Sequence, residues 1–172
     1  WWVRNATTIK TIQQRRHNPH YLHAAYFNTA QLLLENDIAK VVAACDVLVM
    51  AVPSAYAEDA FNQLDKDALK GKKIMSAIKG ILPSNNQLLN DYLKDKFNVA
   101  IEDYFTILGP CHAEEVASEK LSYLTFSGVD EATAKQLAGF FKTEYLNTIT
   151  NHDVIGVQYA AILKNIYALG AG

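Results

Sequence analysis

The fold of this chain is decided by the stretch Asp46-Val47-Leu48-Val49-Met50-Ala51-Val52-Pro53-Ser54. Its apolar run is unbroken until Pro53 stops it. Continuous apolar runs of this length are typical of strands that are buried on both faces, as in parallel sheets. Serine is a favoured residue at the start of a helix. We therefore predict a buried parallel strand that ends near Val52 and a helix that begins near Ser54.

Similar strand-like and helix-like segments alternate along the rest of the chain. Strands are predicted over residues 1–3, 73–78, 104–108, 121–126 and 145–149. Helices are predicted from 83 to about 94, from 111 onward, from 130 to about 141, and over 153–172. This alternation predicts an α/β fold with a mostly parallel sheet flanked by helices. The strands that end near Val52, Ile78 and Leu108 should be neighbours in that sheet.

The composition fits one globular unit and limits the classes of partner. With 172 residues, of which 50% are hydrophobic, the chain can bury one sizeable core. Its net charge is -2 and its Lys and Arg residues are dispersed, which argues against a nucleic-acid-binding surface. No apolar run approaches the roughly 20 residues of a membrane span, and no signal-peptide pattern is found. The two cysteines, Cys45 and Cys111, suit a reducing cytoplasm rather than a disulfide framework.

Unusual residues follow the predicted strands at the edge where open α/β sheets bind ligands. Lys79-Gly80 follows the strand at 73–78, and Gly109-Pro110 follows the strand at 104–108. The lysine would place a cation at this edge, and the free amides of a helix starting at Cys111 would favour an anion. The alternative is an exposed loop lysine and an ordinary strand-to-helix turn. A metal or thiol site at Cys111-His112 is disfavoured, because adjacent helical residues do not face each other.

The last predicted helix carries one lysine, Lys164, within an apolar pattern. The residues around it are nearly all apolar or small, namely Val157, Ala160, Ala161, Leu163, Ile166, Tyr167 and Ala168. A helix that is apolar almost all round is normally buried, and a lysine at its centre is costly to bury unless its charge is paired. The alternative is a lysine whose stem packs along the helix while its head stays in water.

Arg4 follows the first predicted strand directly. In dinucleotide-binding folds, the residue after the second strand contacts the adenosine ribose, and an arginine there accommodates a 2′-phosphate. The strand at residues 1–3 would correspond to that second strand. Arg4 therefore favours NADP. The Gly-rich fingerprint G-x-G-x-x-G that should precede such a strand does not occur in this chain.

Several segments, taken in order, carry a family resemblance. They are Trp2-Val3-Arg4-Asn5, Arg16-His17-Asn18-Pro19-His20-Tyr21-Leu22, residues 46–54, Ala77-Ile78-Lys79-Gly80, Gly109-Pro110-Cys111-His112-Ala113-Glu114-Glu115-Val116-Ala117, Asp153-Val154-Ile155-Gly156-Val157 and Leu163-Lys164-Asn165. Each segment alone is only modestly specific, but together, in this order and at sensible spacing, they are highly specific. Over essentially its whole length, the chain resembles bacterial NAD(P)-dependent glycerol-3-phosphate dehydrogenase.

The resemblance implies catalytic and substrate-binding residues. Lys164 matches the family's catalytic lysine, which exchanges a proton with the C2 oxygen of the substrate. Lys79 matches a lysine that touches both cofactor and substrate. Gly109 and Cys111 match substrate-binding positions, although many relatives have Ser or Thr where this chain has Cys111, and a thiol is the poorer hydrogen-bond partner. The resemblance implies no metal.

The resemblance also implies a nicotinamide cofactor, NADP or NAD, contacted by Arg4, Tyr21, Lys79 and Ala113. The implied fold is a Rossmann-like, mostly parallel sheet flanked by helices, with the start of an all-helical C-terminal domain. Residues 1–150 would form a dinucleotide-binding domain without its first strand and Gly-rich loop. Residues 151–172 would be the first helix of the C-terminal substrate domain, so we expect the chain to be a fragment.

The implied activity is the interconversion of sn-glycerol 3-phosphate and dihydroxyacetone phosphate, which supplies glycerol phosphate for phospholipid synthesis. The expected partner is a small-molecule substrate. We expect no nucleic-acid partner and no membrane span, and a location in the cytoplasm. A homodimer is possible in this family resemblance. Two alternatives remain, a related hydroxy-acid dehydrogenase and a catalytically inactive nucleotide-binding module. The presence of both Lys79 and Lys164 argues against the inactive module.

Overall fold

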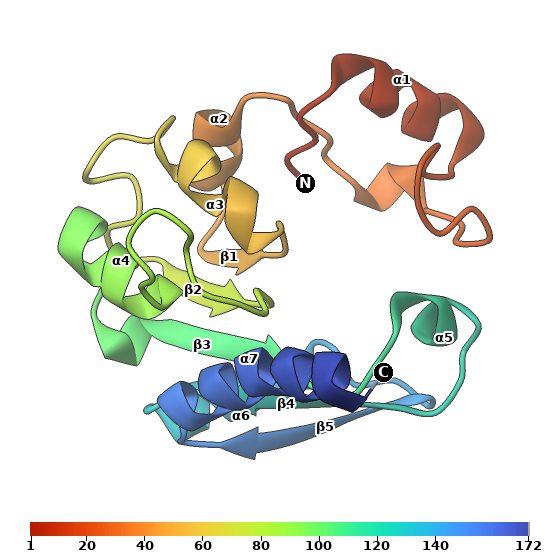
Figure 1. The fold of residues 1–172 in the computed structure, drawn as a ribbon. Helices are drawn as coiled ribbons and strands as arrows, with labels where there is room; N and C mark the ends of the chain where they lie inside the picture. The colour runs from red at the N-terminus through yellow and green to blue at the C-terminus, as the bar shows by residue number, and fades with distance from the viewer. Residues whose placement is uncertain (172) are drawn as a thin grey trace.

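One five-stranded sheet organises residues 1–171, the part of the chain that the computed structural model describes apart from the side chain of Asn165. Across the sheet the strands follow the order β1 (Val47–Met50), β2 (Lys73–Ser76), β3 (Tyr104–Leu108), β4 (Ser122–Ser127) and β5 (Leu146–Asn151). Strands β1, β2 and β3 are parallel, β4 is antiparallel to β3, and β5 is parallel to β4. The predicted mostly parallel, Rossmann-like sheet is confirmed, as is the adjacency of the strands ending near Val52, Ile78 and Leu108 (Figure 1). The predicted burial of β1 on both faces is wrong, because its residues Val47 and Val49 are 36% and 48% exposed.

Helices connect the strands and cover both faces of the sheet (Figure 1). They are α1 (Ala6–Arg15), α2 (Ile38–Ala43), α3 (Ser54–Phe61), α4 (Leu89–Phe97), α5 (Ala113–Ala117), α6 (Glu131–Gly139) and α7 (Val154–Ala171), with short 3₁₀ turns at Thr29–Gln31 and Ile101–Asp103. Side chains fix several of the starting points. Asn5, Asp37 and Asp130 accept hydrogen bonds from first-turn amides of α1, α2 and α6, which satisfies amides that a helix leaves unpaired.

The sheet carries an apolar core on each face. One core joins β1, β2 and β3 to α2, α3, α4 and the first residue of α7, through strand residues Leu48, Ile74 and Tyr104. The other joins β2, β3 and β4 to α6, through Met75, Phe105, Ile107 and Phe126. Successive residues of a strand point to opposite faces, so β3 is buried at all of its positions. This two-sided burial explains why residues 104–108 read as an almost unbroken apolar run.

The first predicted strand is wrong as an element of the sheet. Trp2 makes only an isolated parallel bridge with Glu35. The bridge rests on the Val3 amide, which donates to the Glu35 carbonyl, and on the Glu35 amide, which donates to Trp1. Such a ladder is too short to form a strand.

Two predicted helix starts also need correction. The helix expected from residue 83 begins at Leu89, because residues 82–87 form a turn that is closed by a bridge between Leu82 and Gln87. Within that turn Asn86 has a φ of 55°, which a helix cannot continue through. The helix expected from Cys111 begins at Ala113 and spans only 5 residues.

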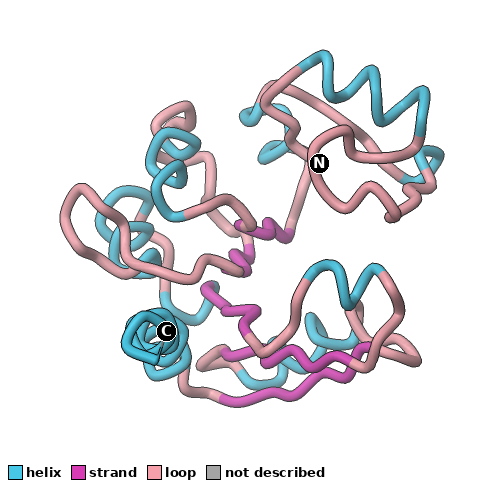
Figure 2. The backbone as a smooth tube through the Cα atoms, turned by 45° about the vertical axis from the view of Figure 1, so that its right-hand side comes forward, coloured by secondary structure: helices cyan, strands magenta, loops and turns pink. Residues whose placement is uncertain are grey.

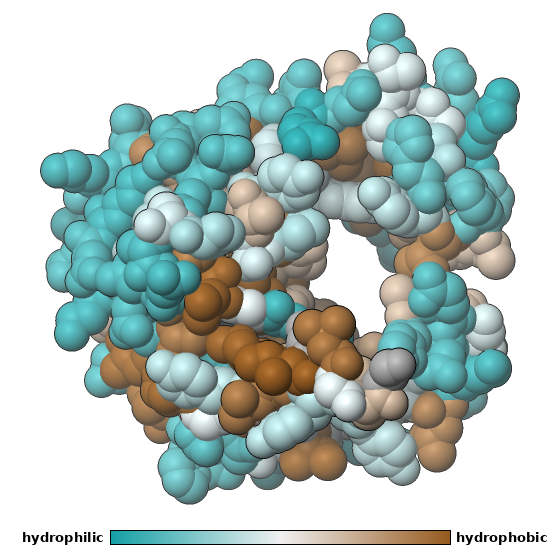
Figure 3. All heavy atoms as spheres, in the orientation of Figure 1, coloured by the Kyte–Doolittle hydropathy of each residue, from teal (hydrophilic) through white to brown (hydrophobic). Residues whose placement is uncertain are grey.

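Helix α7 is exposed over most of its length, although the sequence predicts a buried helix. Val154 and Gln158 are buried in its first turns, whereas Tyr167 and Leu169 are 72% and 84% exposed. The reason is that only the first part of α7 packs on the sheet, chiefly on β3; Figure 2 looks along the axis of this helix. In the space-filling view, apolar side chains gather over α7 (Figure 3).

By length and composition alone, α7 is the one described helix that could cross a membrane, with 18 residues and a mean hydropathy of 1.2. This amends the expectation that no apolar segment approaches that length. It is weak evidence for a span, because core helices of soluble proteins pass the same test. Here the first turns of α7 are already anchored on the sheet by Val154 and Gln158.

Candidate active site at the carboxyl edge of the sheet

A cavity of about 260 Å³ lies between the carboxyl end of β3 and one face of α7. Its lining residues are Lys79, Leu108, Gly109, Pro110, Thr125, Val157, Ala160, Ala161 and Lys164. Because β1, β2 and β3 are parallel, their carboxyl ends share one edge of the sheet. The cavity therefore lies where open α/β sheets bind ligands.

Lys79 and Lys164, the two predicted catalytic residues, line this same cavity although they are far apart in the sequence. Both residues are exposed, and neither takes part in a salt bridge within the described part of the chain. Among the described residues, the lining contains these two ammonium groups and no carboxylate. Like charges around one small cavity repel each other, so the site favours an anionic ligand between them.

Lys79 is held at the rim by the turn that follows β2. The Ala77 amide donates to the Met50 carbonyl at 2.9 Å, which continues the pairing of β1 and β2 past the strand end. Ile78 is buried and anchors the turn. Gly80 then adopts a φ of 157°, and a Cβ atom there would lie 3.1 Å from Ser54 Oγ. The glycine thus lets the chain pass close to the first turn of α3, and Lys79 is left facing the cavity.

Lys164 is placed by the start and the spacing of α7. The carboxylate of Asp153 accepts a hydrogen bond from the Gly156 amide at 2.7 Å, which caps the helix. Val157, Ala160, Ala161 and Lys164 then recur every three or four residues and form one face of the helix. The alanines leave space between α7 and the end of β3, and Lys164 closes that space at one side.

Gly109 has a packing role that the sequence does not reveal. A Cβ atom at this position would lie 2.6 Å from the carbonyl oxygen of Tyr123 and 3.3 Å from the Cα atom of Leu124. Both are backbone atoms of β4, so they can yield only if the strand moves. The absent side chain lets β3 end against β4, and it keeps the cavity wall in place.

We expect Gly109→Ala to destabilise the fold by about 1–3 kcal/mol, the usual cost of overpacking. The matched control is Gly139→Ala at the end of α6, where an added Cβ atom meets nothing within 4 Å. That change should be neutral or stabilise by up to about 1 kcal/mol. Urea unfolding of both variants measures the difference. Equal stability of the two would show that β4 does not constrain Gly109.

Cys111 and Ala113 follow the lining residue Pro110 in the sequence, but they do not themselves line the cavity. Cys111 is half-buried in the segment that leads to α5, and Ala113 is the first residue of that helix. The N-cap residue His112 makes no side-chain capping hydrogen bond. Among the described residues, no group of three or more His, Cys, Asp or Glu side chains is arranged to hold a metal ion.

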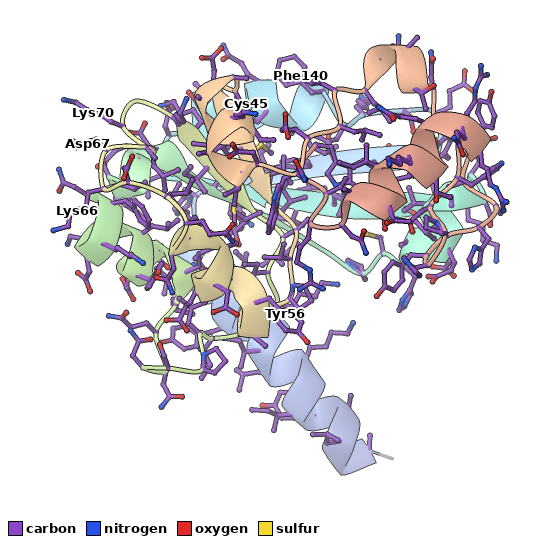
Figure 4. All side chains as sticks on the ribbon, turned by 90° about the horizontal axis from the view of Figure 1, so that it is seen from above. Cys45, Tyr56, Lys66, Asp67, Lys70 and Phe140 are labelled. Atoms are coloured by element: carbon purple, nitrogen blue, oxygen red, sulfur yellow. The ribbon has the colours of Figure 1, made fainter. Side chains whose placement is uncertain are left out.

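Arg4 lies at another part of the molecule, beside α3. Its guanidinium carbon is 5.9 Å from the centroid of the Tyr56 ring, a geometry in which cation and ring attract each other. Tyr56 projects from the first turn of α3, directly after β1, and is 56% exposed (Figure 4). Sequence reasoning missed Tyr56. The available signal was an aromatic residue two positions after Ser54, at the end of a predicted strand.

Tyr21 is not brought to the cavity. It lies in the loop after α1, is 73% exposed, and packs edge-on against His20 with the ring centroids 6.3 Å apart. His17, His20 and His23 occupy the same loop. His20 and His23 are exposed, whereas His17 is half-buried, with its Nδ1 atom 2.9 Å from the Ala25 carbonyl oxygen. The side chain of Asn165 and Gly172, which belong to predicted segments, lie outside the described residues.

Comparison with known proteins identifies curated relatives that are named glycerol-3-phosphate dehydrogenase (NAD(P)+). The family model described as the N-terminus of NAD-dependent glycerol-3-phosphate dehydrogenase matches residues 1–134. The glycerol-3-phosphate dehydrogenase (NAD(P)+) of Limosilactobacillus fermentum is 31% identical over 176 residues, which cover 99% of this chain and 52% of the relative. The glycerol-3-phosphate dehydrogenase (NAD(P)+) 1 of Salinibacter ruber is 31% identical, over 99% of this chain and 50% of the relative.

Solved structures show the same fold. The glycerol-3-phosphate dehydrogenase of Plasmodium falciparum superposes with a TM-score of 0.85 at 24% identity, over 96% of this chain and 46% of that one. The enzyme from Saccharomyces cerevisiae superposes with a TM-score of 0.80 at 22% identity, over 98% of this chain and 51% of that one. The chain thus spans about half the length of the curated relatives that it matches. Since the family model covers most of its residues, the chain belongs to the family of NAD-dependent glycerol-3-phosphate dehydrogenases, matching their N-terminal region.

Proposed function

We propose that this protein, at its natural length, interconverts sn-glycerol 3-phosphate and dihydroxyacetone phosphate with NADP or NAD, and thereby supplies glycerol phosphate for phospholipid synthesis in the cytoplasm. The observation that carries the proposal is the convergence of Lys79 and Lys164 on one cavity at the carboxyl edge of the sheet. The names of the curated relatives support it.

The two ammonium groups suit a phosphorylated ketone and the corresponding alcohol. A phosphate is an anion, and the described residues of the lining supply two cations and no carboxylate, which attracts it. In the proposed mechanism, Lys164 donates a proton to the carbonyl oxygen during reduction and takes it back during oxidation. Lys79 polarises the same oxygen and stabilises its developing negative charge. The nicotinamide supplies the hydride during reduction.

The residues along the carboxyl edge fit a dinucleotide. Arg4 and Tyr56 offer a cation and an exposed ring beside the end of β1, which suit a phosphate and an adenine. Lys79 follows the neighbouring strand, β2, and faces the cavity. We therefore assign the adenosine end to Arg4 and Tyr56 and the nicotinamide end to Lys79. Ala113 and Tyr21 stay in the proposal as further cofactor contacts.

The substrate site in this proposal lies within the cavity. Gly109 forms part of its wall, and Cys111 follows one residue after the lining residue Pro110. Both residues belong to the segment that follows β3, and we propose that this segment contacts the substrate. A thiol binds an oxygen more weakly than a hydroxyl does, so we assign Cys111 a minor part of the affinity.

An apolar slot beside β1 supports a proposal about domain organisation. A cavity of about 410 Å³ separates Trp1 and Trp2 from β1, and nearly all of its lining is apolar. Val47 and Val49 of β1 also line it and are 36% and 48% exposed. We propose that this slot receives the first strand of a dinucleotide-binding domain to which residues 1–150 belong. Residues 151–172 would then begin the helical substrate domain.

We expect Arg4→Asp to remove a preference for NADPH over NADH. A charge-assisted contact with the 2′-phosphate is worth about 1.5–3 kcal/mol, so NADPH affinity should fall roughly tenfold to a hundredfold while NADH affinity changes little. Fluorescence titration with both cofactors measures this. Arg15→Asp, on the exposed side of α1, is the control. An unchanged ratio of affinities would remove Arg4 from the cofactor site.

The proposed function is tested by following NADPH oxidation by the protein of natural length with dihydroxyacetone phosphate. Turnover with this ketone supports the proposal. Turnover only with 2-oxo acids would instead identify a hydroxy-acid dehydrogenase. Binding of NADPH without turnover of any carbonyl substrate would identify an inactive nucleotide-binding module.

A further inference from the structure

Gln158 is a buried polar residue of α7. It is 6% exposed, although glutamine is usually a surface residue. The mechanism proposed above does not use it, and it does not line the cavity between β3 and α7. A polar side chain at such a position must be fully hydrogen-bonded, or it would weaken the fold.

The amide of Gln158 makes three hydrogen bonds that join three elements. Its Oε1 atom accepts from the Tyr104 hydroxyl of β3 at 3.0 Å. Its Nε2 atom donates to Asn90 Oδ1 of α4 at 2.9 Å and to the Val154 carbonyl oxygen of α7 at 3.1 Å. Burial raises the pKa of Tyr104, so this hydroxyl keeps its proton and donates. The donor on one side and the acceptor on the other allow a single orientation of the Gln158 amide.

This orientation bears on where Lys164 points. Lys164 follows Gln158 by six residues on the same helix, which corresponds to about 120° around the axis and about 9 Å along it. A rotation of α7 by about 20° would move side-chain atoms at a radius of about 6 Å by roughly 2 Å. Helix α7 also packs on the sheet through the apolar residue Val154, and apolar packing is less directional than a hydrogen bond.

We propose that Gln158 is a positioning residue, which fixes the rotation of α7 about its axis and so holds Lys164 at the cavity that Lys79 also lines. This inference rests on the proposed proton transfer by Lys164. Gln158 touches no reacting atom and acts only through the helix. It links α4 and β3 of the cofactor-binding unit to the helix that carries the proton donor.

The test is Gln158→Met in the protein of natural length. Methionine keeps the length and the helix propensity of glutamine and removes all three hydrogen bonds. We expect kcat to fall roughly tenfold to a hundredfold, as a displacement of about 1 Å can cause, with the affinity for NADPH unchanged. Proton transfer should become slower than hydride transfer, so the solvent deuterium isotope effect on kcat should rise. Gln136→Met, the same change at an exposed site on α6, is the control.

A double variant separates positioning from simple stability. Gln158→Met takes the Gln158 amide away from the buried Tyr104 hydroxyl and from the buried Asn90 Oδ1 atom, which lowers the melting temperature. Adding Tyr104→Phe removes the hydroxyl and should restore part of the melting temperature, but not the orientation of α7. We therefore expect the double variant to melt above Gln158→Met alone while its kcat stays low. If kcat recovers together with stability, Gln158 has only a structural role and the proposal is overturned.

A measurement that needs no turnover distinguishes a failure of the proposed dehydrogenase function from a failure of the proposed role of Gln158. Amide hydrogen exchange over residues 154–164 should accelerate in the double variant, while exchange in α6 stays unchanged. Inactivity of the unsubstituted protein overturns the proposed dehydrogenase function alone, since exchange still reports whether Gln158 holds α7. Unchanged exchange in α7 together with unchanged kcat overturns the role of Gln158 alone.

Discussion

Replacing Lys164 with alanine should lower kcat by about 10²–10⁴-fold, the usual contribution of a general acid–base group. The reason is geometric. Lys164 lines the cavity at the carboxyl edge together with Lys79, and Lys164 is the residue to which we assign proton transfer. Steady-state kinetics with dihydroxyacetone phosphate in the protein of natural length measures the effect.

Folding and cofactor binding should survive this change. Alanine is the best helix former, and Lys164 is exposed in this chain and makes no salt bridge among the described residues. We therefore expect the free energy of unfolding to change by no more than about 0.5 kcal/mol. NADPH affinity should also persist, because Arg4 and Tyr56 lie on other elements. A folded Lys164→Ala variant with full kcat would show that this lysine is a solvated surface residue.

The central strands could be predicted because buried strand positions require apolar residues, which form a recognisable run in the sequence. The strand at β3 is buried at all of its positions, and its apolar run is bounded by Gly109 and Pro110. Helix α3 follows β1 at Ser54, as the Pro-Ser pair indicates. These signals are local, so they can be interpreted without knowledge of the rest of the fold.

Helices with few buried residues were missed. Helices α1 and α2 do not appear in the sequence-based prediction, and each contains few buried residues, namely Ile12 in α1 and Ile38 and Val42 in α2. The exposure of α7 was mispredicted for the opposite reason. Its apolar pattern is strong, but a pattern indicates only that a helix has apolar faces and does not show which element covers them.

For the candidate site too, the features with a local sequence signal could be predicted, and those that depend on tertiary contacts could not. Lys79 and Lys164 could be singled out from the sequence, because a lysine at a strand end and a lysine in an apolar helix are both unusual. That the two line one cavity could not be derived from local patterns, since it depends on how α7 crosses β3. The same holds for the approach of Arg4 to Tyr56 and for the hydrogen bonds of Gln158. Tertiary contacts of this kind leave no periodic trace in the sequence.

Replacing Lys79 with alanine should damage both cofactor and substrate binding. The side chain faces the cavity from the turn after β2. Strand β2 lies between β1, which precedes the helix of Tyr56, and β3, which ends next to Gly109. Loss of one preorganised cation at a developing oxyanion typically costs about 10²–10³-fold in kcat. The affinity for NADPH should also fall, roughly tenfold or more, if a charge-assisted hydrogen bond is lost.

The pattern of losses distinguishes the two lysines. Lys164→Ala should lower kcat and spare the dissociation constant of NADPH, whereas Lys79→Ala should change both. Lys135→Ala, which removes an exposed lysine from α6 on the opposite face of the sheet, controls for the loss of one positive charge. Since an anion in the cavity is attracted by both ammonium groups, removing Lys79 should also weaken inhibition by inorganic phosphate more than the control does. If Lys79→Ala matches Lys135→Ala in all three measurements, Lys79 is an ordinary loop lysine, and the cationic cavity is not the substrate site.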